Sequence, residues 1–182
     1  MNKTIYIIRH CEAEGQAPEA PLTAKGKEQA KVLSAFLSGR EADHIVSSPF
    51  LRAVQTIEPF VAANNLKIET DNRLQERVLS SVSMPDWMDK LEAAYQDFNL
   101  KYEGGESSNE AAGRIVAAVN DLCADDTGNS IIVAHGGIIS LLLHHYDKSF
   151  GFEAWKQLSN PDVYALQIAE HTHQLRRLWF ED

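Results

Sequence analysis

Short apolar runs alternate with longer amphipathic stretches along this chain. Runs of roughly four to eight apolar or β-branched residues are typical of buried strands, whereas apolar positions three and four residues apart indicate helices. The runs that predict strands are 4–8, 43–47, 67–70, 130–134, 163–168 and 174–179. Helical spacing covers 23–37, 49–64, 85–98, 107–123 and 136–145. We expect the last two strands to form a hairpin that turns around residues 170–173.

Strands that alternate with helices predict a layered fold. We expect an α/β domain, a three-layer αβα sandwich around a mostly parallel central sheet. Residues 1–182 fit one such domain, because a chain of this length can bury most of its surface around a single core. Helix starts are indicated by Ser48 before Pro49, and by the capping-box spacings of 83–86 and 107–110.

The net charge of the chain limits the classes of partner that it is expected to bind. It carries 17 Lys and Arg against 26 Asp and Glu, a formal net charge of −9. Such an acidic chain is not expected to bind nucleic acid or an anionic membrane surface. No apolar stretch approaches the roughly 20 residues of a membrane span, and the first one is too short for a secretory signal. Together with only two cysteines, this predicts a cytoplasmic protein.

Basic side chains and histidines follow three of the predicted strands. Arg9 and His10 end the first, Arg52 comes shortly after the second, and His135 follows the fourth. The carboxyl ends of parallel strands share one edge of a sheet, where ligands bind. We therefore expect two arginines and two histidines to form a phosphate cradle there, with a small phosphate ester as the partner.

The residue types match the requirements of phosphoryl transfer. A neutral imidazole such as His10 can attack phosphorus without first losing a proton. Arg9 and Arg52 can bind phosphate oxygens through forked hydrogen bonds, and Gly136 lets backbone N–H groups at a helix start approach the anion. Glu76 is the candidate proton donor for the leaving oxygen.

Several motifs in order carry a family resemblance. They are Arg9-His10-Cys11-Glu12 with Gln16 after it, Leu22-Thr23-x-x-Gly26, Ser47-Ser48-Pro49-x-x-Arg52-Ala53, Leu74-Gln75-Glu76-Arg77, Gly104-Gly105-Glu106-Ser107 and Ala134-His135-Gly136-Gly137. Together they resemble the histidine phosphatase superfamily, the phosphoglycerate mutase-like group. The likeness runs across nearly the whole chain.

The resemblance implies a role for each motif residue. His10 would become phosphorylated, and Arg9, Arg52 and His135 would hold the transferring phosphoryl group. Gln16 would assist at the rim and Glu76 would act as general acid and then base, with no metal ion or other cofactor. The chain also departs from the family pattern. Cys11 stands where the family usually has glycine, and Gln16 stands where asparagine is commoner. The Gly and Trp-Glu-Gly element that often follows the acid is replaced by Val-Leu-Ser-Ser at 78–81.

Some residues allow a second interpretation. Glu76 can instead pair with Arg73 or Arg77, and the role of Glu12 stays open. Cys11 does not fit a cysteine-dependent phosphatase, which needs an arginine six positions later, although nearby arginines are expected to lower its pKa and make it oxidisable. The histidines of 144–145 and 171–173 are not expected to bind metal, because adjacent helical positions face different ways.

The segment 76–103 is the predicted specificity element or short cap. Apolar residues of its helix form either a core-facing stripe or a lid over the site; they are Trp87, Met88, Leu91, Tyr95 and Phe98. Its few cations, Arg77, Lys90 and Lys101, are offset by acidic residues. We therefore expect uncharged or apolar leaving groups, in contact with Met84, Trp87 or Tyr102.

The expected function is metal-independent hydrolysis of phosphate monoesters through a phosphohistidine on His10. A cofactor-dependent phosphoglycerate mutase and a sugar-bisphosphatase are the alternatives, and the lack of a longer insertion favours hydrolysis. A non-catalytic phospho-ligand binder is less favoured, since binding alone needs no nucleophile.

Overall fold

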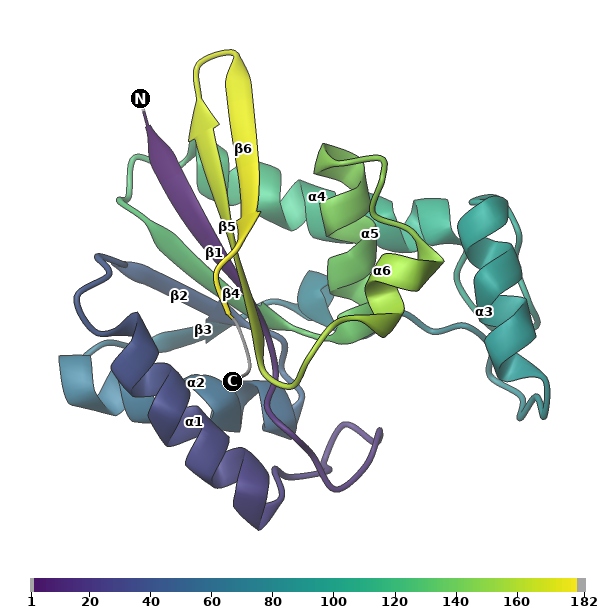
Figure 1. The fold of residues 1–182 in the computed structure, drawn as a ribbon, viewed down its shortest axis with the longest axis horizontal. Helices are drawn as coiled ribbons and strands as arrows, with labels where there is room; N and C mark the ends of the chain where they lie inside the picture. The colour runs from purple at the N-terminus through teal and green to yellow at the C-terminus, as the bar shows by residue number, and fades with distance from the viewer. Residues whose placement is uncertain (1, 180–182) are drawn as a thin grey trace.

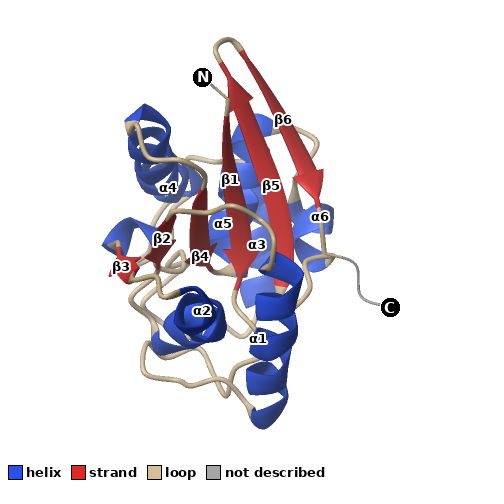
Figure 2. Ribbon diagram, turned by 90° about the vertical axis from the view of Figure 1, so that its left-hand side faces the viewer, coloured by secondary structure: helices blue, strands red, loops and turns tan. Residues whose placement is uncertain are grey.

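A six-stranded sheet forms the centre of the protein (Figures 1 and 2). The computed structural model describes residues 2–179. The strands are β1 (Lys3–Arg9), β2 (His44–Ser47), β3 (Ile68–Thr70), β4 (Ser130–Ala134), β5 (Asp162–Ala169) and β6 (Thr172–Arg177). Their order is β3-β2-β4-β1-β5-β6, so that β3 and β6 lie at the edges. The first four run parallel, β5 is antiparallel to β1, and β6 is antiparallel to β5. This confirms the mostly parallel sheet and the terminal hairpin.

Helices cover both faces of the sheet. They are α1 (Ala24–Leu37), α2 (Leu51–Asn64), α3 (Trp87–Gln96), α4 (Ser108–Ala124), α5 (Gly136–Tyr146) and α6 (Phe152–Lys156), with a short 3-10 turn η1 (Asn72–Leu74). Buried residues of α1 and α2 pack in one cluster and those of α4 and α5 in another. The predicted three-layer arrangement is confirmed, whereas α6 and η1 were not expected.

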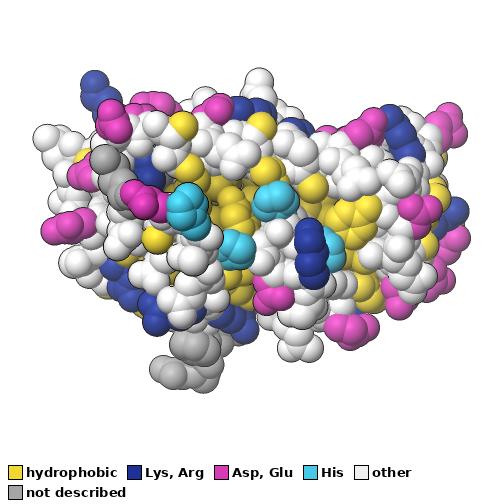
Figure 3. Space-filling model, turned by 90° about the horizontal axis from the view of Figure 1, so that it is seen from above, with side chains coloured by type: hydrophobic (Ala, Val, Ile, Leu, Met, Phe, Trp, Pro, Cys, Tyr) yellow, Lys and Arg dark blue, Asp and Glu magenta, His cyan; other side chains and the backbone are white. Residues whose placement is uncertain are grey.

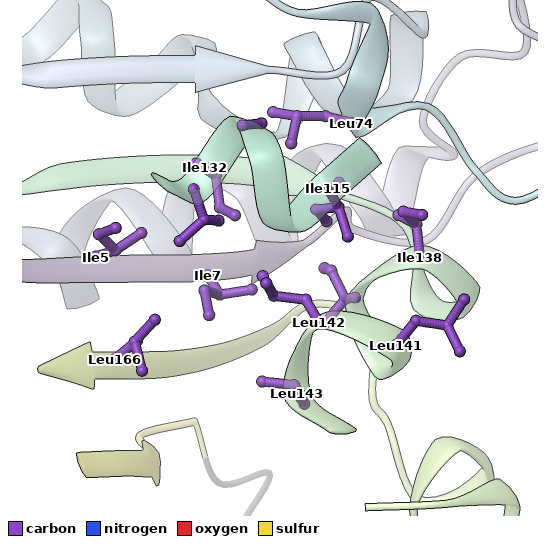
Figure 4. Packing of buried hydrophobic residues seen from close by; sticks show 14 of the residues in the cluster. Ile5, Ile7, Leu74, Ile115, Ile132, Ile138, Leu141, Leu142, Leu143 and Leu166 are labelled. Atoms are coloured by element: carbon purple, nitrogen blue, oxygen red, sulfur yellow. The ribbon is translucent and has the colours of Figure 1, made fainter. Parts of the chain in front are cut away.

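The alternation of side chains along each strand separates the two cores. In β4, Ile131 and Val133 belong to the α1 and α2 side, and Ile132 belongs to the α4 and α5 side. Figure 4 shows the second core, where Ile7 of β1 meets Leu142 of α5. Every residue of β4 is buried, as expected for a parallel strand with helices on both faces. The same packing fixes where the strand ends lie.

The predicted helix starts were partly wrong. The capping box of α4 is present, since Ser107 Oγ accepts from the Glu110 N–H and the Glu110 carboxylate accepts from the Ser107 N–H. By contrast, α2 begins at Leu51 rather than Pro49, because Phe50, the residue before the helix, has an extended backbone. No capping box forms at 83–86 either, and α3 begins after Asp86, whose side chain makes no capping bond.

The helix α3 is partly core-facing, as one of the two interpretations predicted, and the predicted lid stays a prediction. Figure 1 shows α3 standing apart from the sheet, beyond α5 and α6. Leu91 is buried and Tyr95 packs on the α4 and α5 core, where its hydroxyl bonds Ser140 Oγ. Trp87 and Met88, at the start of the same helix, are 47% and 40% exposed. One side of α3 therefore packs on the core, and its first turn is exposed to solvent.

Candidate active site

Three strand ends meet at one edge of the sheet. Arg9, the last residue of β1, is in register with Ala134 of β4, and Ser47 of β2 is in register with Val133. The His10 N–H then donates to Ala134 O at 3.1 Å, and the Ser48 N–H to Val133 O at 2.8 Å. These bonds extend the parallel ladder by one residue. Arg9, His10, Arg52 and His135 are thereby brought together, as the strand-end argument predicted.

The orientation of His10 is fixed by its neighbour along the chain. His10 Nδ1 lies 2.6 Å from Cys11 O. A carbonyl can only accept, so Nδ1 carries the proton and donates it. In neutral His10 the lone pair therefore lies on Nε2, which accepts from Arg52 Nε at 3.3 Å. The imidazole presents an unprotonated nitrogen toward the arginine that is expected to hold phosphate.

Burial keeps His10 neutral. The pKa of His10 is lowered to about 4, chiefly by desolvation; the bond to Cys11 O raises the pKa, and the charges of Arg52 and Arg9 lower it. An imidazole with a lone pair is the form that attacks phosphorus. His10 is consequently ready to react at neutral pH without a separate base.

Arg52 is fixed by backbone carbonyls of a loop that precedes α1. Its side chain is 1% exposed, and Nη1 donates to Gln16 O at 3.1 Å and Ala17 O at 2.9 Å. Burial lowers the pKa of Arg52, with the charge of Glu76 acting in the opposite sense. No direct carboxylate partner neutralises this guanidinium among the bonds of the described residues. The guanidinium of Arg52 is held in place, and its positive charge is available to bind an anion.

Arg9 is held from the other side of the site. Its Nη1 donates to Leu158 O at 2.9 Å, in the loop between α6 and β5. From the same loop, Asn160 Nδ2 donates to His10 O at 2.9 Å. Sequence patterns did not point to this loop, because it matches none of the motifs. It supports both members of the Arg9-His10 pair.

His135 is buried beside His10, with ring centroids 5.2 Å apart. Its Nε2 bonds Ser48 Oγ at 2.8 Å, and Ser48 Oγ also accepts from the Phe50 N–H at 3.2 Å. The phenyl ring of Phe50 lies edge-on to His135, with centroids 5.0 Å apart. Burial is the largest cause that lowers the pKa of His135, followed by the charges of His10, Arg52 and Arg9. His135 is a neutral hydrogen-bonding group.

Two polar atoms of this cluster are buried with no hydrogen-bond partner among residues 2–179. They are Arg9 Nε and His135 Nδ1. A buried donor or acceptor left unsatisfied costs about 1–3 kcal/mol, and such groups are uncommon in folded proteins. A phosphate oxygen can accept from both an arginine Nε and an imidazole N–H. The cluster is therefore incomplete in a way that a bound phosphate group would complete.

Glu76 occupies the N-terminus of α5. Its Oε1 accepts from the N–H groups of Ile138 at 2.8 Å and Arg77 at 2.7 Å, and Oε2 accepts from Gly137 at 3.0 Å. Pairing with the Arg73 or Arg77 side chain is not observed, since Arg73 binds Asp71. Backbone N–H groups at this helix start were expected to approach phosphate, but the N–H of Gly137 binds Glu76 instead. Oε2 accepts one bond fewer than Oε1.

The two glycines at the start of α5 make room for different side chains. A Cβ on Gly136 would lie 2.9 Å from Arg9 Nε, and a Cβ on Gly137 would lie 2.7 Å from Glu76 Oε1. These separations are shorter than side-chain contacts allow. Gly136 therefore admits the phosphate-binding arginine, and Gly137 admits the candidate acid.

Arg114 and Glu106 clamp the loop that carries Glu76. Arg114 donates to Arg73 O at 2.7 Å, Gln75 O at 2.8 Å and Glu76 O at 3.1 Å. Its Nε and Nη2 also bind the two oxygens of Glu106 at 2.7 and 3.0 Å. The Glu106 carboxylate in turn accepts from the Val78 N–H at 2.9 Å. No sequence signal pointed to Arg114, and Glu106 was noted only as a motif residue.

The remaining sequence candidates have clear positions. Gln16 is exposed at the rim, where its carbonyl binds Arg52. Glu12 is not directed at Arg9, because its carboxylate accepts from Thr23 Oγ1 at 2.9 Å and faces Lys25 at 3.5 Å. The expectation that arginines activate Cys11 is wrong, since burial raises the pKa of its thiol to about 12.

The other histidines lie away from this site. His173 Nε2 bonds Tyr146 O at 3.0 Å, and His144 Nδ1 bonds Phe150 O at 2.9 Å. Figure 3 shows histidine side chains (cyan) on a face of the molecule with other groups between them. Within residues 2–179, no three His, Cys, Asp or Glu side chains are placed to hold a metal ion. No helix in that part of the chain is long and apolar enough to span a membrane.

The chain is similar in sequence to proteins of one superfamily. The family model of the histidine phosphatase superfamily (branch 1) matches residues 5–180. A relative from Salmonella paratyphi C, named "Probable phosphoglycerate mutase GpmB", is 28% identical over 171 residues. The match covers 84% of this chain and 77% of that relative.

Solved structures share the same architecture. Bacillus stearothermophilus YhfR gives a TM-score of 0.78 at 22% identity, with 96% of each chain covered. A mycobacterial glucosyl-3-phosphoglycerate phosphatase gives 0.77 at 23% identity, with 97% of each chain covered. An alpha-ribazole phosphatase from Shigella flexneri gives 0.76 at 24% identity, with 96% of this chain and 95% of that chain covered. These likenesses concern the fold.

Proposed function

Since the chain belongs to the histidine phosphatase superfamily (branch 1) and so to the enzymes that hydrolyse phosphate monoesters, we propose that it transfers the phosphoryl group to His10 and then to water. The observation that carries this proposal is the unprotonated Nε2 of His10 beside Arg52. A binding protein would need the cations and not a nucleophile. An incoming phosphate takes over the Arg52 Nε–H, because its oxygens are better acceptors than imidazole, and this frees the lone pair.

The first step forms a bond between His10 Nε2 and phosphorus as the bond to the leaving oxygen breaks. Arg9 and Arg52 supply the positive charge that the transferring group requires, and His135 donates from Nδ1. Glu76 gives a proton to the leaving oxygen. We assign Gln16, which is exposed at the rim, to contact with the outer part of the substrate, and the N–H of Gly136 to phosphate binding.

The second step returns the enzyme to its starting state. Water gives a proton to Glu76, and its oxygen bonds to phosphorus as the N–P bond breaks. His10 is released neutral, and inorganic phosphate leaves. Both positive charges come from arginines, so we propose that neither step requires a metal ion.

The test follows the phosphoryl group itself. Phosphate release from an aryl phosphate should persist in excess chelator, and an acid-labile phosphoenzyme should be trapped during turnover of the wild-type protein. His10→Ala should remove both turnover and labelling. Full activity of His10→Ala, or labelling at another residue, would overturn the mechanism, and loss of activity in chelator would overturn its metal independence.

The GpmB relative favours a second candidate, phosphoglycerate mutase. A mutase returns the phosphoryl group to a second hydroxyl of the sugar acid rather than to water. Interconversion of 2- and 3-phosphoglycerate that depends on a bisphosphoglycerate primer would support this candidate. Release of inorganic phosphate without a primer would exclude it.

A further inference from the structure

A hollow of about 480 Å³ opens beside the phosphate cradle. It shares Glu76 and Phe50 with the site, and Phe50 contacts both His135 and the Arg52 guanidinium. The residues that line it are Gln16, Pro18, Phe50, Glu76, Arg77, Val78, Leu79, Ser80, Val82, Met84 and Trp87. A leaving group whose oxygen receives a proton from Glu76 would lie here. The volume is within the roughly 300–1,000 Å³ of ordinary small-molecule sites.

The walls of this hollow are mainly apolar and open to solvent. Val78 and Val82 are each 46% exposed, and Trp87 is 47% exposed. With the adjacent Met88 they make up four of the six large hydrophobic side chains that are exposed in the described chain. Single exposed apolar residues are ordinary, but a cluster around one hollow marks a binding surface.

Arg77 lines the hollow but is only 7% exposed, and the two lysines of the 76–103 segment face carboxylates. Arg77 directs Nη1 to Ser108 Oγ at 2.9 Å and Nη2 to Glu106 O at 3.0 Å, toward α4. Lys90 faces Asp86 at 3.7 Å, and Lys101 binds Glu110 at 2.9 Å. Tyr102, expected as a contact, is turned away and binds Lys90 O.

The wall of the hollow is held in place by hydrogen bonds to residues 103–106. Val78 N–H donates to Glu106 Oε2, and Val78 O accepts from the Glu106 N–H at 2.7 Å. The Ser81 N–H donates to Glu103 O at 2.9 Å. A preformed apolar wall loses little entropy when a ligand binds.

We propose that this hollow is the leaving-group subsite and that its ligands are bulky, uncharged apolar or aromatic alcohols esterified to one phosphate. Val82, Met84 and Trp87 determine specificity by covering the apolar part, while the cradle holds the phosphate. This inference rests on the proposed phosphatase function and names its substrate class. Esters with a second phosphate or a carboxylate are disfavoured, because Arg77, the cation among the lining residues, is 7% exposed and directs both Nη atoms to Ser108 and Glu106.

The test compares esters that differ in the leaving group alone. Phenyl phosphate and 2-naphthyl phosphate have leaving oxygens of similar acidity and differ by one ring. The wild-type kcat/KM should be about tenfold higher for the naphthyl ester, since one extra apolar group in a fitting pocket discriminates by about that factor or more. Trp87→Ala and Val82→Lys should reduce the ratio to about two. Val32→Lys, on the exposed face of α1, is the matched control and should keep the wild-type ratio.

A charged ester completes the comparison. Val82→Lys should raise kcat/KM for 3-phosphoglycerate while it lowers that for the naphthyl ester. Equal effects of Trp87→Ala on both aryl esters, or a wild-type preference for 3-phosphoglycerate or a bisphosphate, would overturn the subsite. Trapping of phosphorylated His10 separates this failure from failure of the phosphatase proposal, because the phosphoenzyme forms whether or not the hollow selects the ester.

Discussion

Replacing Gly137 with alanine should detach Glu76 from α5 while leaving the phosphate cradle in place. The new Cβ would lie 2.7 Å from Glu76 Oε1 and 3.0 Å from Arg77 Cγ. The carboxylate is the end of a flexible side chain, so it moves more readily than the helix backbone. Glu76 would then lose its bonds to the N–H groups of Gly137 and Ile138.

The expected effect follows from the strength of those bonds. A hydrogen bond to a charged group contributes about 1.5–3 kcal/mol, and each 1.4 kcal/mol in a barrier is about a tenfold change in rate. Misplacing the acid should therefore lower kcat for an alkyl phosphate by about 10–100-fold. An aryl phosphate, whose leaving oxygen needs little protonation, should keep its kcat within about threefold.

The neighbouring glycine provides the matched control. A Cβ on Gly136 would lie 2.9 Å from Arg9 Nε, so Gly136→Ala should displace a phosphate ligand and slow both ester types to a similar extent. Gly113→Ala in α4 meets nothing within 4 Å. It reports the effect of alanine on helix stability, which is favourable by up to about 1 kcal/mol.

Steady-state kinetics of the four proteins on an alkyl and an aryl phosphate make the comparison, with thermal unfolding to verify the fold. A selective loss with the alkyl ester in Gly137→Ala identifies Glu76 as the acid. Equal losses for both esters, or no loss with the alkyl ester, would refute this assignment and leave the proton donor to be sought elsewhere.

Three further predictions concern the groups around the nucleophile. Because the pKa of His10 is lowered to about 4, kcat/KM should show no His10 ionisation between pH 5 and 8 and should fall as the pH drops through about 4; an acid limb near 6.5 would contradict this. Arg114→Lys cannot bind three carbonyls and a carboxylate at once, so it should lower kcat about tenfold or more for alkyl phosphates and less for aryl phosphates, whereas a purely structural role would lower both alike. With the pKa of Cys11 raised to about 12, the thiol should resist peroxide and Cys11→Ser should retain activity; rapid peroxide inactivation of wild type that Cys11→Ser prevents would disprove this.

The cradle was predictable because it depends on topology more than on detail. Parallel strands end at one edge, so Arg9, His10 and His135 had to meet once β1 and β4 were recognised. Arg52 was reached by the same argument from β2. The register between β1 and β4 then places the ends of these two strands level with each other. No side-chain contact has to be known for this step.

The start of α2 shows where local signals fail. Ser48 before Pro49 favours a helix that begins there, yet Phe50, the residue before the helix, has an extended backbone. In that conformation the Phe50 ring lies against His135 and Arg52, and the Ser48 hydroxyl serves His135 as well as the Phe50 N–H. Tertiary contacts at the site override the local preference, and they involve partners far away in the sequence.

The surroundings of Glu76 could not be predicted from the sequence for a related reason. A Gly-Gly pair at a helix start predicts that an anion binds there, but not which anion. Here the protein's own carboxylate takes those N–H groups, and the clamp from Arg114 joins segments about forty residues apart. Such long-range bonds leave no periodic trace in the sequence.

The residue types alone do not determine the net charge of the site. In the structure, burial of the histidines determines it. Two arginines and two histidines can carry as many as four positive charges, but desolvation and the neighbouring arginines lower the pKa of both His10 and His135. The arginines therefore supply the charge, and the histidines supply a lone pair and a hydrogen bond. On a chain with a net charge of −9, only a local pair of cations of this kind can capture a phosphate dianion. The same burial that neutralises the histidines strengthens the attraction of the arginines, because screening by water is weaker inside the protein.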